Sequence, residues 1–104
     1  MRPQPGSQAE RRAVQDLVAR LDAQDAVPVA EMGALPDGPG IFLLRDAKGT
    51  VLHVGHSVDG PWCVEARRMA KAGQHVAALA ISDRRITLLA WHLAVGHLLP
   101  VQLG

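Results

Sequence analysis

The chain has 104 residues, of which 48% are hydrophobic and 20% are charged, so it has room for one domain with one hydrophobic core. Its formal net charge of +1 indicates no particular class of partner, and its single cysteine excludes an internal disulfide. The lack of disulfides is consistent with a reducing, cytoplasmic location. The polar N-terminus lacks the apolar run of a signal peptide.

The first part of the sequence predicts a tail, a helix and a connector. Residues 1–6 are expected to be disordered. A helix should begin at Ser7, because Ser7-Gln-Ala-Glu10 has the pattern of a capping box, and it should end near Gln24. Residues 7–34 are therefore expected to hold this helix and a connector, in which residues 26–29 form a short extended piece. The apolar stripe of the helix contains Ala13, Leu17, Val18 and Leu21.

The main domain is expected to span residues 35–104 and to begin with a β-hairpin. The runs 41–45 and 50–54 are β-prone, and Asp46-Ala-Lys-Gly49 between them is typical of a four-residue turn. Gly49 can adopt the positive φ that such a turn requires.

The register of this hairpin follows from the pairing at the turn. If Arg45 lies opposite Thr50, then Phe42 lies opposite His53 on the same face of the sheet. A bulge at Gly49 would shift this pairing by one residue.

Three further elements complete the expected fold. A helix should run from Trp62 to about Ala72, residues 76–81 should form a third strand, and a last helix should start at Ser82-Asp83, run to about Leu99 and stop at Pro100. The predicted class is α/β in the broad sense and α+β more narrowly. It has a small antiparallel sheet of about three strands flanked by helices, with an extra N-terminal helix. The apolar stripe of the first of these two helices contains Trp62, Ala66, Met69 and Ala70.

The segment 86–104 carries no formal charge when its histidines are neutral. It approaches the length of a membrane span, but it contains His92, His97 and Pro100. On a helix the two histidines would point about 140° apart, which makes them a poor ligand pair. We expect a buried or partner-covered helix with no membrane insertion, and a homodimer through 86–104 or through a strand edge.

Gly40-Ile41-Phe42 and, after ten residues, His53-Val54-Gly55 resemble the paired signature of the GIY-YIG nuclease superfamily. The order of hairpin, helix, strand and proline-terminated helix is also similar to that family, over roughly residues 35–103. The resemblance implies a small domain in which two tyrosines, an arginine on the next helix and a glutamate on the last helix surround the scissile phosphate. The glutamate holds a single divalent metal.

These four family positions correspond to Phe42, His53, Cys63 and Trp91 in this sequence. Phe42 has no hydroxyl with which to orient a water molecule. Trp91 cannot ligate Mg²⁺, which requires oxygen ligands. The resemblance therefore implies a domain without catalytic residues or a cofactor, and Mg²⁺ would be needed only if an altered nuclease used His53 as its base.

Five residues are candidates for contacts with nucleic acid: His53, His56, Arg67, Arg68 and Lys71. The two histidines flank Gly55 and could act as a pair that contacts a phosphate or shuttles protons. The three cations form one face of the predicted helix. The alternatives are ordinary strand-end histidines and a solvated helix face. The absence of tyrosine argues against a stacking platform for single strands.

The cysteine and histidines have other interpretations. His53, His56, Cys63 and His75 lack the spacing of a zinc site. Cys63 could be a nucleophile near the histidines, but a single helical cysteine is more often a small buried residue. Arg67 lies one turn after Cys63 on the same helix face and could still contact a phosphate.

Three functions follow from the sequence. The first is a non-catalytic GIY-YIG-like domain that binds a protein partner or, weakly, DNA or RNA. The second is an active endonuclease with altered residues, which a nuclease assay with Mg²⁺ and Mn²⁺ separates from the first. The third is a structural dimerisation module, for which light scattering is the test. Because fold does not determine function, these remain hypotheses.

Overall fold

The computed structural model describes residues 8–99. The predicted tail at residues 1–6, the capping residue Ser7 and the stop at Pro100 lie outside the described residues. The elements are α1 (Gln8–Ala23), β1 (Val27–Pro28), the 3₁₀ helix η1 (Val29–Ala34), β2 (Gly40–Arg45), β3 (Val51–Ser57), α2 (Trp62–Met69), β4 (His75–Ala80) and α3 (Arg84–Leu98).

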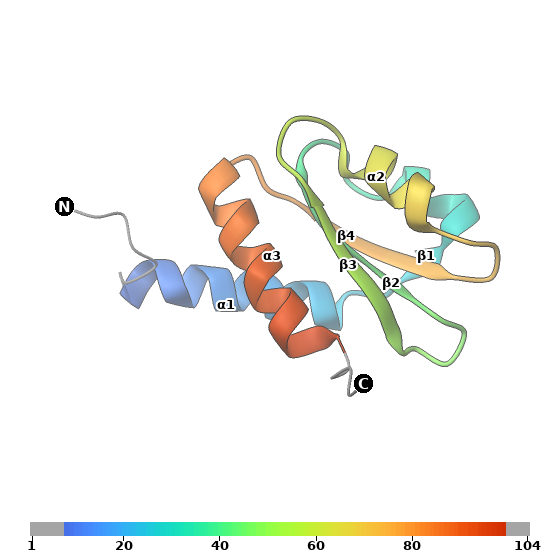
Figure 1. Ribbon diagram of the computed structural model, residues 1–104, viewed down its shortest axis with the longest axis horizontal. Helices are drawn as coiled ribbons and strands as arrows, with labels where there is room; N and C mark the ends of the chain where they lie inside the picture. The colour runs from blue at the N-terminus through green and yellow to red at the C-terminus, as the bar shows by residue number, and fades with distance from the viewer. Residues whose placement is uncertain (1–7, 100–104) are drawn as a thin grey trace.

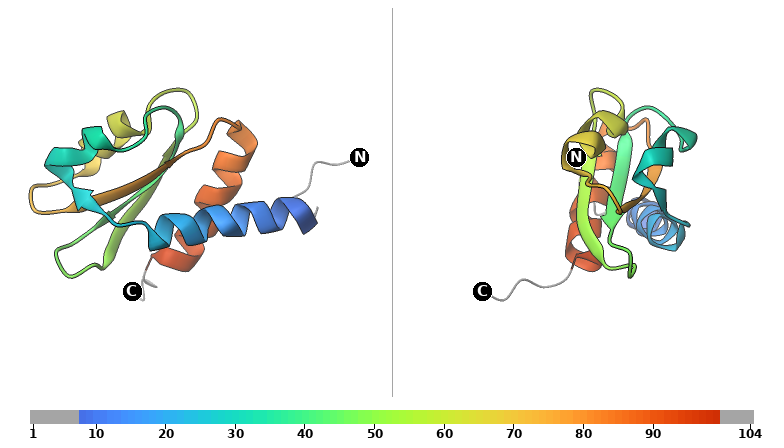
Figure 2. Two further views of the ribbon diagram at one scale, coloured as in Figure 1. Left: turned by 180° about the vertical axis from the view of Figure 1, so that it is seen from behind. Right: turned by 90° about the vertical axis from the view of Figure 1, so that its right-hand side faces the viewer.

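Within residues 8–99 the strands form one antiparallel sheet in the order β1-β4-β2-β3. Helices α1 and α3 pack on one face of this sheet, while α2 and η1 pack on the other (Figure 1). Figure 2 shows that α2 and α3 both lie towards the β3 side, whereas α1 and η1 lie towards β4. The α+β class is confirmed, and β1 adds a short fourth strand to the three expected.

The core divides into two clusters because the central strand β2 alternates its side chains between the two faces. Ile41 and Leu43 point towards α1 and α3, and Phe42 and Leu44 point towards α2 and η1. A strand that is buried on both faces reads as a continuous apolar run, which is what residues 41–44 show.

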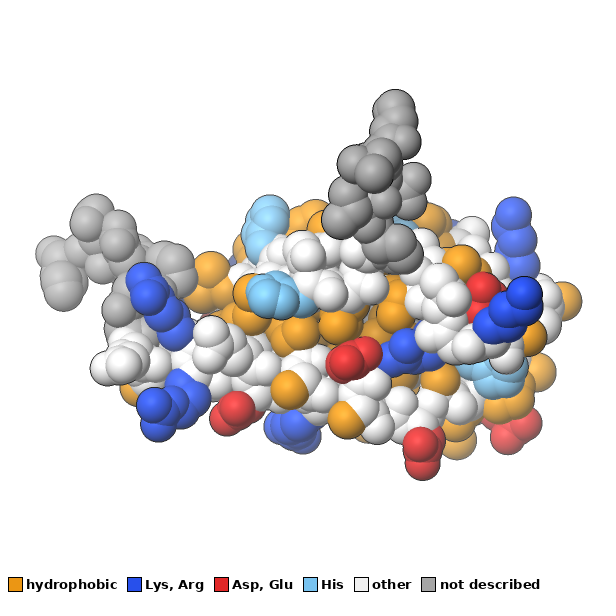
Figure 3. Space-filling model, turned by 90° about the horizontal axis from the view of Figure 1, so that it is seen from below, with side chains coloured by type: hydrophobic (Ala, Val, Ile, Leu, Met, Phe, Trp, Pro, Cys, Tyr) orange, Lys and Arg blue, Asp and Glu red, His pale blue; other side chains and the backbone are white. Residues whose placement is uncertain are grey.

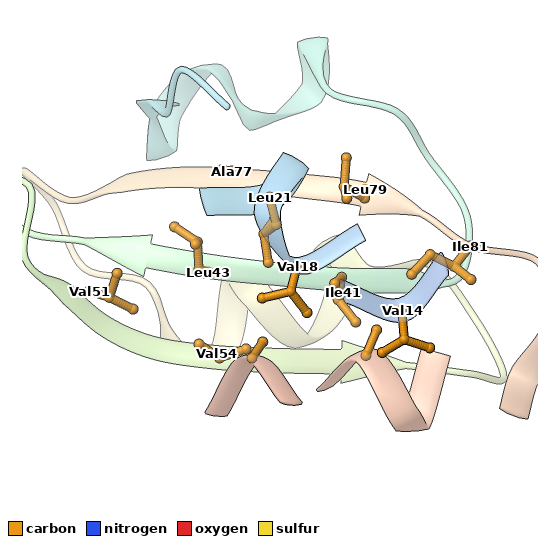
Figure 4. Packing of buried hydrophobic residues seen from close by; sticks show 12 residues of the cluster. Val14, Val18, Leu21, Ile41, Leu43, Val51, Val54, Ala77, Leu79 and Ile81 are labelled. Atoms are coloured by element: carbon orange, nitrogen blue, oxygen red, sulfur yellow. The ribbon is translucent and has the colours of Figure 1, made fainter. Parts of the chain in front are cut away.

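Helix α1 buries a stripe that differs from the expected one. Figure 4 shows Val14, Val18 and Leu21 directed at the sheet. The prediction that Ala13 belongs to this stripe is wrong, because Ala13 is exposed. A valine buries more apolar area than an alanine, so the helix is turned to cover Val14 instead.

The predicted hairpin turn is confirmed. Gly49 has a φ of +91°, and its N–H donates to the Asp46 carbonyl at 3.0 Å. The Asp46 carboxylate accepts hydrogen bonds of 2.9 Å from the backbone N–H groups of Lys48 and Thr50. The aspartate thus stabilises the turn with its own side chain.

The predicted register is wrong. Arg45 lies opposite Val51 and not Thr50, and the ladder shifts again between Leu44 and Arg45, so that Phe42 lies opposite Gly55 and His53 lies opposite Leu44. Leu52 is the extra residue on β3 at this bulge. Phe42 and His53 are diagonal neighbours on one face, with ring centroids 5.9 Å apart.

Strand β1 covers only the first part of the outer edge of β4, and a side chain next to the end of α1 forms hydrogen bonds with the remaining part. The Gln24 amide accepts a 2.7 Å hydrogen bond from the Ala78 N–H and donates a 2.9 Å hydrogen bond to the Ala78 carbonyl. Both backbone groups of Ala78 are therefore satisfied where no strand lies beside them in residues 8–99.

The last three predicted elements are present, with one boundary corrected. Helix α2 ends at Met69 and does not reach Ala72, since Ala70 is already extended with a ψ of 144°. Met69, expected in the buried stripe, is 44% exposed. Helix α3 begins as predicted, because the Asp83 carboxylate accepts a 3.0 Å hydrogen bond from the Ile86 N–H. Among residues 8–99, no helix has the length and apolar character needed to cross a membrane.

Candidate functional site

The structure separates the four residues that the resemblance matches to catalytic positions. Phe42 and His53 lie on the face of the sheet that α2 covers, and Cys63 lies on α2 itself. Trp91 belongs to α3, on the other face. The four side chains therefore do not converge on one point.

Phe42 is fully buried, with none of its surface exposed. Its ring lies over the backbone of Gly55, so close that a Cβ at this glycine would be 2.3 Å from a ring carbon. The rings of His53 and Trp62 each lie 5.9 Å from it, centroid to centroid. Phe42 acts as a core residue, out of reach of a substrate.

The two histidines of the second motif point to opposite faces of the sheet. His53 contacts Phe42 on the α2 side, whereas His56 contacts Trp91 of α3. The hypothesis that they act as a pair is therefore not supported by their geometry. Burial lowers the pKa of both imidazoles. The pKa of His56 is lowered further by His92 and raised by the carboxylate of Glu65.

Trp91 is anchored to the outer edge of the sheet. Its indole N–H donates a 3.0 Å hydrogen bond to the carbonyl of Val54 on β3. Its ring lies 4.2 Å from that of His56 and 4.8 Å from that of His92, centroid to centroid. We call His56, Trp91 and His92 the aromatic cluster. It joins two elements that are far apart in the sequence.

The three candidate cations are exposed but do not share one helix face. Arg67 and Arg68 are on α2, whereas Lys71 lies beyond the end of the helix, so the prediction of a three-residue helix face is wrong. Arg68 approaches Glu65 at 3.8 Å, and its side chain is 71% exposed. An ion pair this exposed contributes little to stability. The three cations nevertheless stay close together in the chain, at and just after the end of α2.

Cys63 is half-buried, and its Sγ lies 4.0 Å from an oxygen of Asp37. The expectation of a small buried residue is thus met only in part. Within residues 8–99, no group of three or more His, Cys, Asp or Glu side chains is arranged to hold a metal ion.

Comparisons with known proteins return no relative: no protein-family model, no curated protein and no solved structure matches this chain.

Sequence reasoning missed the aromatic cluster. The adjacency of Trp91 and His92 was visible, but nothing local indicated that α3 crosses the β3 edge beside His56. The bulge at Leu52 leaves His56 on the same face as Val54, two residues earlier in the strand. The shared face of Val54 and His56 places His56 beside Trp91 only when it is known that α3 covers this face.

The two half-buried histidines, His53 and His56, should make stability depend on pH. Because both folded-state pKa values lie below the usual value of about 6.5, the unfolded chain takes up protons more readily than the folded protein. The free energy of unfolding should therefore be highest above pH 6.5 and fall as the pH drops below it. Urea unfolding between pH 5 and 8 measures this. His56→Gln should flatten the profile, and exposed His97→Gln is the control. A profile unchanged by His56→Gln would contradict the assignment.

Proposed function

We propose that this chain is a GIY-YIG-like domain that lacks the nuclease chemistry and binds nucleic acid. The resemblance to the GIY-YIG family rests on the hairpin, in which Gly40 begins the first strand and Gly55 lies in the second. The antiparallel pairing of β2 with both β3 and β4, and the α2 and α3 helices that follow β3 and β4, support the proposal. A cytoplasmic location fits the single cysteine.

One observation supports the non-catalytic part of the proposal most directly. The residues at the reacting positions are used as structure: Phe42 fills the core over Gly55, and the Trp91 indole is bonded to the Val54 carbonyl. Neither side chain supplies the hydroxyl or carboxylate that the family's mechanism requires. His53 is the one titratable group left at these positions that lies next to Phe42.

The binding part of the proposal rests on the cations around α2. In the part of the chain that the structure describes, Arg67 and Lys71 form no ion pair with an acidic side chain. Both are exposed and available to phosphates. Three cations release few counterions, so affinity should be weak and strongly dependent on salt.

The test is binding of a DNA duplex as a function of salt concentration. Each phosphate that is no longer neutralised should reduce the log-log salt slope by about 0.9. The variant Arg67→Ala/Arg68→Ala/Lys71→Ala should therefore bind more weakly and with a shallower slope, while its unfolding midpoint stays unchanged.

The matched control is a triple variant that removes the same charge from exposed cations on α1 and in the hairpin turn: Arg12→Ala, Arg20→Ala and Lys48→Ala. This control should keep most of the affinity. Equal weakening in both triple variants would show that only net charge matters and that the α2 region is no binding face.

Self-association through 86–104 is a second proposal, supported by the surface along α3. Figure 3 shows hydrophobic side chains gathered on the underside of the molecule, over α1 and α3. A groove of about 380 Å³ runs between these helices, lined on the apolar side by Val18, Leu93 and Leu98. Light scattering of the free protein at high micromolar concentration decides between a monomer and a dimer.

A further inference from the structure

The aromatic cluster is a rigid, partly exposed ring surface. The hydrogen bond from Trp91 to the Val54 carbonyl fixes the indole against β3, so its orientation is set before any ligand arrives. His56 and Trp91 are half-buried, and His92 is exposed. The three rings follow one another at centroid distances of 4.2 and 4.8 Å, tilted by 38° and 53°.

A cation on α3 flanks this surface. Arg84 lies seven residues before Trp91, about two turns earlier on nearly the same line of α3. Its guanidinium contacts Asp59 at 3.0 Å, but the side chain is 66% exposed and can reach another anion. A positive charge therefore lies on the same helix line as the rings.

We propose that the aromatic cluster is a stacking platform for the bases of single-stranded nucleic acid, with Arg84 contacting a neighbouring phosphate. This rests on the proposed function and specifies its substrate class. Every nucleobase offers a flat face to a ring, so the platform selects unpaired strands without selecting their sequence. A duplex keeps its bases stacked inside, where these rings cannot reach them.

The imidazole and indole rings of the aromatic cluster suit an uncharged base, and Arg84 is left to contact the phosphate beside that base. The aromatic cluster differs in this respect from the cationic α2 region. Among residues 8–99, none of the ring contacts involves Arg67 or Lys71.

The experiment uses the full chain and three fluorescent probes: a 12-nucleotide oligothymidine, an abasic strand of the same length and charge, and a blunt 12-base-pair duplex. Fluorescence anisotropy should show the oligothymidine binding about 5- to 150-fold more tightly than the abasic strand, the range expected for one stacked base. His92→Ala should reduce this ratio of affinities, and His92→Phe, which restores an aromatic ring without the imidazole nitrogens, should recover it. Trp91 itself is kept because it anchors α3.

Intrinsic tryptophan fluorescence gives an independent reading. Trp62 is 1% exposed, so quenching by oligothymidine would report on Trp91. The abasic strand should quench much less.

The outcomes separate the two proposals. If oligothymidine and the abasic strand bind equally and the α2 triple variant weakens both, the nucleic-acid function stands and the platform is wrong. If oligothymidine binds more tightly but His92→Ala leaves the ratio unchanged, the platform is also wrong. If no probe binds at high micromolar protein and low salt, the proposed function fails and the platform fails with it.

Discussion

Replacing Gly55 with alanine should destabilise the protein by about 1–3 kcal/mol, the usual cost of overpacking a core. The added Cβ would lie 2.3 Å from the Phe42 ring. The ring has no room to move, because it is fully buried between His53 and Trp62. The midpoint of urea denaturation should fall accordingly.

A double-mutant cycle assigns this cost to the contact. Phe42→Leu removes the ring, so Gly55→Ala should cost less in the Phe42→Leu background than in the native one. Gly60→Ala is the matched control, because no atom lies within 4 Å of the Cβ it would add. If Gly55→Ala costs the same in both backgrounds, the ring is not the reason for the glycine.

The purified protein should not cleave DNA or RNA in a metal-dependent reaction. Enzymes lower barriers by about 8–23 kcal/mol, and a general base alone contributes typically 10²–10⁴-fold. His53 is the base that contacts Phe42, and Trp91 and Cys63 stand where the resemblance implies the metal ligand and the cationic clamp. A long incubation with supercoiled plasmid and structured RNA, with Mg²⁺ or Mn²⁺, measures this.

The control for cleavage is His53→Ala. A contaminating nuclease would nick the plasmid equally in both preparations and would leave the expectation intact. Nicking that requires metal and disappears in His53→Ala would instead establish an altered nuclease and overturn the non-catalytic proposal.

Local chemistry explains which parts of the fold could be predicted. Asp46 and Gly49 specify the hairpin turn by themselves, through side-chain acceptance and a positive φ. Asp83 specifies the start of α3 in the same way, by capping it. The turn and the cap depend on residues within four positions of one another, so a short stretch of sequence is enough to predict them.

The register and the site depended on packing between distant segments. Arg45 pairs with Val51 and not with Thr50, and the bulge at Leu52 shifts the ladder by one residue more, so that the partner of Phe42 is Gly55 and not His53. The ring contact between His56 and Trp91 joins positions 35 apart and exists only because α3 packs beside β3. Gly55 lies within β3, where a glycine often marks a close approach of another group, but nothing near it in the sequence identifies Phe42 as that group.

Two side chains, Gln24 and Trp91, form hydrogen bonds to the outer edges of the sheet. These hydrogen bonds affect how the protein should behave at high concentration. A strand margin with free N–H and C=O groups is a template for ordered aggregation. Among residues 8–99, the Trp91 indole occupies the Val54 carbonyl on one margin, and the Gln24 amide occupies both polar groups of Ala78 on the other. Proline at position 28, in the short strand β1, lacks the N–H that an incoming strand would need. The sheet is therefore closed to extension at these points, and fibril growth from the folded state should be disfavoured.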